Sequence, residues 1–192
     1  MGPISIIAIQ NPLEAEDVLC NQIREILRIC DGEFVPPLSQ RESTTMHPKK
    51  GGCDDAELIS ADAPDVYFDY LLRQPVRVVF SGNRMAGFLS YIATYSSPEL
   101  AERTPSIQVT TICIRPEFRG RNLSTHLYEN LMANPSDGTS VTQYISTRTW
   151  STNFAHIAVL EKLGFEIVTR IRDARGDGID TLYFSRQLPE KP

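Results

Sequence analysis

The chain of 192 residues lacks the features that define several large protein classes. Its cysteines have neither CxxC nor His-paired spacing, which argues against a zinc or dithiol motif and favours reduced thiols. No apolar run is long enough to span a bilayer, and residues 1–10 have neither a positive leader nor a cleavage site. We therefore expect a cytoplasmic protein with no metal and no membrane partner. The cysteines are Cys20, Cys30, Cys53 and Cys113.

Excess positive charge and glycine-rich nucleotide motifs are lacking too. The formal net charge is −5, which disfavours a nucleic-acid partner. It weakly suits a cationic acceptor such as an amine, although solubility alone explains it. No Gly-x-Gly-x-x-Gly follows the first expected strand, which argues against a Rossmann enzyme. The chain has no internal repeat, and its length with 41% apolar residues fits one domain with one core.

The chain does contain alternating strand and helix patterns. A helix is expected from Asn11-Pro12 to Asp31-Gly32, and another over residues 65–72, with Val66, Tyr67, Tyr70 and Leu71 as its apolar positions. Between them, residues 31–60 are rich in proline, glycine and serine and predict a long loop. The expected strands cover residues 5–9, 76–81, 85–95, 107–114, 141–147, 165–172 and 181–186.

Residues 107–124 carry the clearest functional signal. A β-branched, apolar strand ends at Pro116, and the chain then enters a helix whose Leu123, Leu127 and Leu131 share one face. This arrangement places unpaired N–H groups, the positive end of the helix dipole and two guanidinium groups around one concavity. Such a concavity suits a pyrophosphate, and Gly120 lets an anion approach the backbone. The same Arg-Gly pattern also occurs in ordinary turns.

A second strand-to-helix unit follows. From Asn153 the sequence predicts a helix with Ile157, Leu160 and Leu163 on one face, ended by Gly164 before the next strand. Asparagine at a helix N-cap satisfies an otherwise unpaired N–H group. Two units of this kind, joined by the strand at residues 141–147, form a recognisable pair.

The two segments resemble signatures of the GNAT superfamily of acyl-CoA N-acyltransferases. The first signature corresponds to residues 112–116 and 119–124, with Asn122 and Ser124 where small residues are usual; the second corresponds to Asn153 and residues 161–165. The resemblance implies an α/β (α+β) fold with a mixed, mostly antiparallel sheet of six to seven strands and about four helices. It also implies one domain over residues 1–192, an acyl-CoA-binding core at 106–173, and an acceptor site beside the 31–60 loop.

The same resemblance implies acetyl-CoA as acyl donor and a primary amine of a small molecule or peptide as acceptor. In the family the strand before the helix separates from its neighbour, which frees main-chain N–H groups for the pantetheine and the acyl oxygen. No metal is required, and family members often form homodimers. The implied acetyl-CoA-binding residues are Ile112, Cys113, Ile114, Arg119, Gly120, Arg121, Asn122, Leu123, Ser124 and Asn153.

The proton donor is where this sequence departs from the family. Many members have a tyrosine in the helix that corresponds to the one after Asn153, where it protonates the leaving thiolate. In this sequence the position is occupied by Leu160. His156 lies one turn earlier on the same side, and we hypothesise that it donates a proton or a hydrogen bond to the thiolate. Tyr144 and Ser151 are the fallback candidates. The alternative is a histidine on a partly exposed helix with no catalytic role.

The base is less determined by the sequence. The strand at 107–114 has no carboxylate, and Thr110 and Thr111 are too weak, so deprotonation could pass through water. Glu33 and Tyr91 are candidates for guiding the ammonium group, although such residues are more often structural.

Two residues near the second helix complete the list of candidates. Trp150 and Arg148 could border the acceptor, with core packing as the alternative for Trp150. The alternative function is a non-catalytic acyl-CoA sensor that keeps the pyrophosphate-binding concavity but no longer catalyses acyl transfer.

Overall fold

A seven-stranded sheet runs through the computed structural model, which describes residues 2–37, 63–135 and 142–189. The strand order is β1-β2-β3-β4-β5-β7-β6, and every neighbouring pair is antiparallel except β4 and β5. The strands are β1 Ile4–Ile9, β2 Val76–Ser81, β3 Arg84–Tyr95, β4 Ser106–Ile114, β5 Tyr144–Trp150, β6 Glu166–Ile171 and β7 Thr181–Gln187. This arrangement confirms the mixed, mostly antiparallel sheet expected from the sequence.

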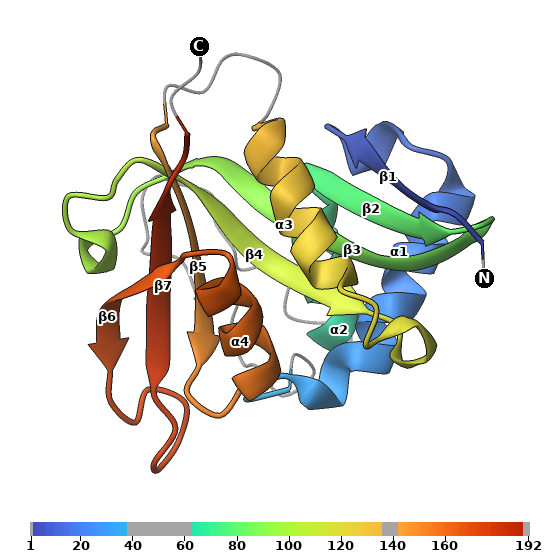
Figure 1. The fold of residues 1–192 in the computed structure, drawn as a ribbon. Coiled ribbons are helices and arrows are strands. Elements are labelled where there is room, and N and C mark those ends of the chain that lie inside the picture. The colour runs from blue at the N-terminus through green and yellow to red at the C-terminus, as the bar shows by residue number, and fades with distance from the viewer. Residues whose placement is uncertain (1, 38–62, 136–141, 190–192) are drawn as a thin grey trace.

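Two pairs of helices cover the two faces of the sheet (Figure 1). Helices α3 and α4 pack with the core on one face, where Leu123, Leu127 and Leu131 are all buried, as their spacing predicts. Helices α1 and α2 pack on the other face through a cluster that includes Ile23 and Phe68. The helices are α1 Asp17–Cys30, α2 Ala63–Leu72, α3 Leu123–Ala133 and α4 Phe154–Lys162.

The first two helices correct the sequence-based expectation. Pro12 begins only a 3₁₀ turn, Pro12–Glu14, and α1 starts at Asp17 because Glu16 is extended, with φ −60° and ψ 140°. In α2 the buried face contains Phe68 and Leu71, whereas Tyr67 and Tyr70 are only half-buried. Their hydroxyl groups explain this, since a tyrosine keeps its polar end near a partner.

Other expectations meet the limits of the described residues. Of the 31–60 loop, only residues 31–37 are described, beginning with a 3₁₀ turn at Asp31–Glu33. Cys20, Cys30 and Cys113 carry free thiols, whereas Cys53 and the side chain of Val66 lie outside the described residues. Strand β5 extends to Trp150, three residues beyond its expected end.

Candidate active site

The site begins where β4 and β5 part. They pair in parallel only from Ser106–Tyr144 to Val109–Thr147, after which β4 continues along β3 alone and β5 along β7. The divergence of the two strands is visible in Figure 1. A bulge in β4 coincides with it: Thr111 pairs with Ser90 and Val109 with Tyr91, so Thr110 is the extra residue. A bulge bends its strand and increases the local twist, which explains why the strands separate there.

Beyond the bulge, backbone groups of β4 face the gap. Arg115 N–H donates to the Ala86 carbonyl, which fixes the alternation of the antiparallel ladder. Two residues earlier, the N–H of Cys113 is therefore directed at β3, whereas those of Ile112 and Ile114 are directed away from it. Only the amides of Ile112 and Ile114 can therefore bind a ligand in the gap. The expectation that the Cys113 amide is also free is wrong, because this amide is directed at β3.

The start of α3 closes one end of the gap as a concavity of amides. Gly120 and Asn122 both adopt left-handed conformations, with φ of 71° and 57°, which bends the chain into the helix. Within the described residues, the N–H groups of residues 120–125 have no backbone acceptor, and Asn122 makes no side-chain cap. The Arg119 amide, in contrast, is bonded to the Pro116 carbonyl. Several adjacent free amides at a helix N-terminus form an anion-binding concavity.

The two arginines of this turn point in different directions. Arg119 extends under the end of β4, where its Nε donates to the Ile114 carbonyl at 3.0 Å and its Nη1 pairs with Glu33 at 2.8 Å. Arg121 lies outside the cleft, because its Nη1 bonds Ser81 Oγ at 3.0 Å and its guanidinium stacks 5.7 Å from the Phe118 ring centroid. The expectation of two guanidinium groups around the concavity is therefore wrong for the side chain of Arg121.

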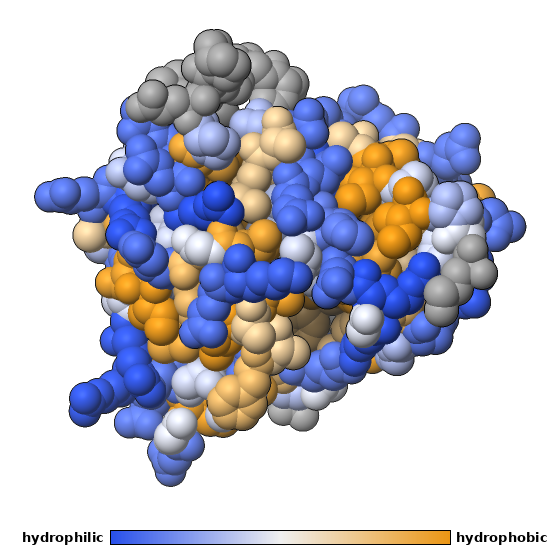
Figure 2. All heavy atoms as spheres, viewed as in Figure 1, coloured by the Kyte–Doolittle hydropathy of each residue, from blue (hydrophilic) through white to orange (hydrophobic). Residues whose placement is uncertain are grey.

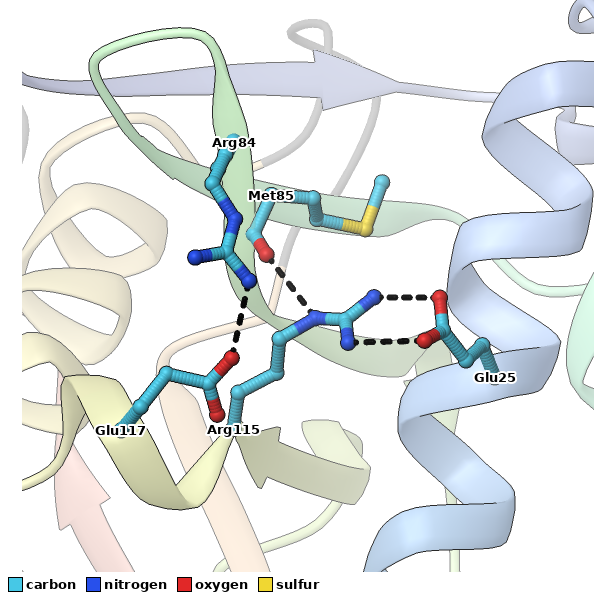
Figure 3. A network of polar contacts seen from close by, with 5 residues as sticks. All are labelled: Glu25, Arg84, Met85, Arg115 and Glu117. Carbon is cyan, nitrogen blue, oxygen red and sulfur yellow. Dashed lines mark hydrogen bonds and ion pairs between the residues drawn. The ribbon is translucent and has the colours of Figure 1, made fainter.

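A polar network holds the end of β4 in place (Figure 3). Arg115 donates from Nη1 and Nη2 to the two carboxylate oxygens of Glu25 on α1, at 3.1 and 2.6 Å, and from Nε to the Met85 carbonyl at 3.1 Å. Its side chain is only 10% exposed. Beside it, Arg84 pairs with Glu117 at 3.0 Å, in a contact open to solvent. Arg115 thus fixes β4 to both α1 and β3 next to the ligand-facing amides.

His156 faces the gap from the first turn of α4. Its Nε2 lies 2.9 Å from the hydroxyl of Tyr128, a fully buried residue of α3. Burial lowers the pKa of His156 to about 4 and raises the pKa of Tyr128. At neutral pH both side chains are uncharged, so His156 can offer a hydrogen bond but holds almost no excess proton. Thr147 completes the contact, bonding Tyr128 and donating to the Val109 carbonyl at 3.1 Å.

Asn153 caps α4, as the sequence predicts. Its side-chain oxygen accepts from the His156 N–H at 3.3 Å, and Gly164 has a φ of 73° just after the C-cap at the far end. Leu160 is completely buried in the core and does not line the gap. The cap fixes the first turn of α4, and with it the position of His156.

The other catalytic candidates are scattered. Glu33 borders the gap but is paired with Arg119. Tyr144 is at the first residue of β5, at the opposite end from the divergence, and does not line the gap. Ser151 Oγ accepts from the Asp180 N–H, and Tyr91 is buried with the Arg77 guanidinium 5.3 Å from its ring centroid.

The opposite wall of the gap is formed by polar and aromatic residues. The hydroxyls of Tyr67 and Thr111 share a hydrogen bond of 2.6 Å. The rings of Phe34 and Trp150 lie 6.1 Å apart between centroids, which fastens the residues after α1 to the end of β5. The thiols of Cys30 and Cys113 lie in the same wall, and a hydrogen bond from Cys113 lowers the pKa of Cys30.

Together these walls enclose a cleft of about 530 Å³. Figure 2 shows the surface hollowed between α4 and the start of α3. Of the candidate site residues, the cleft brings together Ile112, Cys113, Ile114, Arg119, Gly120, Asn122, Leu123, Ser124, Asn153, His156, Glu33, Arg148 and Trp150.

Tyr128 and the cleft residues Thr125, Thr147 and Phe34 were not named in the sequence analysis. Tyr128 follows Leu127 on a helix whose apolar spacing makes any aromatic residue a core candidate, so nothing local marks its hydroxyl. Thr147 could have been found only from the point at which β5 leaves β4. No group of three metal-ligating side chains exists among the described residues, and none of the helices described could cross a bilayer.

The fold is similar to that of solved acetyltransferases. The yncA protein of Salmonella typhimurium, solved with its cofactor acetyl-CoA, is 17% identical, with a TM-score of 0.64 over 98% of this chain and 95% of its own. An N-acetyltransferase from Staphylococcus aureus is 14% identical (TM-score 0.61; 98% and 100% covered). The aminoglycoside 6'-N-acetyltransferase of Enterococcus faecium is 15% identical (TM-score 0.63; 98% and 99%). At these identities the likeness establishes the fold.

The sequence itself establishes the family. The model of the Acetyltransferase (GNAT) family matches residues 41–165, about two-thirds of the chain. No significant match is found among curated proteins. The chain belongs to the GNAT family of acetyltransferases.

Proposed function

We propose that the protein is an N-acetyltransferase that moves an acetyl group from acetyl-CoA to a primary amine of a small molecule or peptide by direct attack. The observation that carries the proposal is the parting of β4 and β5 after Val109 and Thr147, with free amides along one side and at the start of α3. The named reactions of the neighbours from S. aureus and E. faecium, and the acetyl-CoA in the Salmonella structure, support it.

The concavity fits the diphosphate of acetyl-CoA. An anion there would accept hydrogen bonds from the N–H groups of residues 120–125 and meet the positive end of α3. No side chain of Gly120 obstructs the approach, and Asn122 supplies the second left-handed residue that the turn requires. Arg121 contributes only its amide, because its guanidinium is bound to Ser81.

The amides of Ile112 and Ile114 would hold the pantetheine and polarise the acyl carbonyl. Bound acetyl-CoA supplies a thioester whose carbonyl carbon a neutral amine can attack. Amides fixed in a strand stabilise the developing negative charge without reorganising. Arg115 keeps them fixed through Glu25 and Met85.

His156 would act by hydrogen bonding to the departing thiolate, with Asn153 orienting it and also reaching the pantetheine. A group with a pKa of about 4 is almost wholly neutral at pH 7, which disfavours a cationic acid and leaves the neutral N–H as donor. Glu33, which is paired with Arg119, would guide the ammonium group of the acceptor. The proton of the ammonium group would leave through water. Tyr144 is disfavoured as an acid because it lies outside the cleft.

The test combines a binding titration with turnover. Release of free CoA from acetyl-CoA is measured with a panel of polyamines, amino acids, aminoglycosides and peptide N-termini, and mass spectrometry detects the acetylated product. Turnover on at least one amine is expected. Tight binding without turnover on the whole panel would support the alternative, a non-catalytic acyl-CoA sensor, which the buried Leu160 at the family's tyrosine position favours. Absence of acetyl-CoA binding would contradict both.

Three sequence-based expectations stay predictions: a single domain over residues 1–192, a cytoplasmic location and a possible homodimer.

A further inference from the structure

Arg148 lies on the side of the cleft that faces α1 and α2, called the acceptor side below because the acceptor is expected next to the residues that follow α1. The side chain of the preceding residue, Thr147, bonds Tyr128 of α3, so Thr147 faces the side of the sheet covered by α3 and α4. Successive residues of a strand point to opposite faces, and Arg148 therefore points to the side of α1 and α2. It lines the cleft, is half-buried, and is directly opposite Tyr183 of β7 in the register.

Two neutral phenols lie beside this guanidinium. Tyr183 hydrogen-bonds with Arg148, and Tyr70 of α2 lies close enough to interact with its charge. Burial raises the pKa of both phenols, so neither becomes an anion at neutral pH. The two tyrosines orient the arginine without compensating its charge.

The charge balance of the cleft leaves Arg148 in excess. The charged residues that line it, among those described, are Glu33, Arg119 and Arg148. Glu33 and Arg119 form an ion pair of 2.8 Å, and Arg148 makes no ion pair with any carboxylate in the described ranges. In a chain with a net charge of −5, this local positive charge is not a consequence of composition. A half-buried cation held by neutral groups can pair with an anion.

That anion does not come from acetyl-CoA in the proposed arrangement. The diphosphate concavity begins at Gly120, on the α3 side of the sheet, whereas Arg148 points to the opposite side. Trp150 follows Arg148 by two residues, and so shares its face, and its ring packs against Phe34. The acceptor side therefore offers a guanidinium next to an aromatic surface.

We propose that Arg148 binds the carboxylate of the acceptor, and that the acceptor is an amine carrying that carboxylate, of the α-amino-acid class. A planar guanidinium matches a carboxylate with two parallel hydrogen bonds. The aromatic pair of Trp150 and Phe34 would contact the side chain of the amino acid. This inference rests on the proposed function, since it names the substrate class of the same cleft.

The test is a binding experiment that does not depend on turnover. The full chain, saturated with CoA, is titrated by calorimetry with a panel of free amino acids and with the carboxamide of each, which keeps the amine and removes the anion. We expect at least one amino acid to bind about tenfold or more tightly than its carboxamide. Arg148→Gln should reduce this preference to less than about twofold, and Arg148→Lys should keep part of it because the charge remains.

Controls separate a lost anion site from a damaged protein. Arg172→Gln removes an exposed arginine that does not line the cleft and should keep the full preference. CoA affinity should be unchanged in Arg148→Gln, which reports an intact fold.

The inference is overturned if no amino acid binds, if the carboxamides bind equally well, or if Arg148→Gln keeps the preference. Turnover on amines without a carboxylate, at the same efficiency, would also overturn it while leaving the proposed function intact. Selective binding of amino acids without any acetylation would support the inference and contradict the proposed function instead.

Discussion

The neutral state of His156 predicts a specific loss of stability in acid. Its pKa in the folded protein is about 4, against the ordinary value of 6.5 for an unfolded chain. The folded-state pKa is the lower one, so the unfolded state binds the proton first and acid favours unfolding. The contribution of His156 to stability is fully present above about pH 6.5, declines as the pH falls, and is lost below about 4.

The size of the effect follows from the two pKa values. At pH 5 an unfolded histidine is almost fully protonated, whereas about nine-tenths of His156 stays neutral in the folded state. Linkage converts this difference into about 2 kcal/mol of unfolding free energy between pH 7.5 and pH 5. The ring borders the cleft and keeps some contact with solvent. We therefore expect about 1 to 2 kcal/mol.

Urea unfolding at pH 7.5 and pH 5 measures this loss in the wild type and in His156→Gln. Other groups that titrate in this range contribute equally to both proteins, so the difference between the two losses isolates His156. An NMR titration midpoint near 6.5 for His156, or equal losses in wild type and His156→Gln, would refute the assigned burial.

Three further predictions concern the cofactor side of the cleft. Gly120→Ala forces an alanine into a left-handed conformation, which costs about 1 kcal/mol and should weaken CoA binding about fivefold. Gly32→Ala, where the added methyl group has open space, should leave CoA affinity unchanged, and calorimetry compares the two variants. Ile114→Pro removes an N–H directed at the cleft and should abolish CoA binding with the circular dichroism spectrum retained; unchanged affinity would contradict this role. Arg115→Met leaves a buried carbonyl without its donor and should lower the unfolding free energy by about 1–3 kcal/mol, against less than about 1 kcal/mol for the solvent-exposed Arg84→Gln; equal losses in urea unfolding would refute the difference (Figure 3).

The sequence predicts those parts of the fold that depend on local signals. The spacing of Leu123, Leu127 and Leu131 places α3, and the cap at Asn153 with Gly164 delimits α4, because helix periodicity and capping act within a few residues. The predicted start of α1 at Pro12 was wrong, because a proline is accommodated in the first turn of a 3₁₀ helix as well as in that of an α-helix.

Contacts between distant residues could not be predicted in this way. Arg119 pairs with Glu33, which is 86 positions away in the sequence, and Tyr128 of α3 contacts His156 of α4. No local pattern fixes such distances. The direction of the Cys113 amide depends on the register between β3 and β4, which the patterns of the individual strands do not set.

The central claim is that the main chain at residues 120–125, with Ile112 and Ile114, binds CoA. Titration of ¹⁵N-labelled protein with CoA, followed through its amide NMR signals, tests it most directly. We expect the largest shifts at these amides, and pantetheine, which lacks the diphosphate, should move Ile112 and Ile114 but not residues 120–125. Unmoved signals at 120–125 with saturating CoA, or the same shifts with pantetheine, would contradict the account.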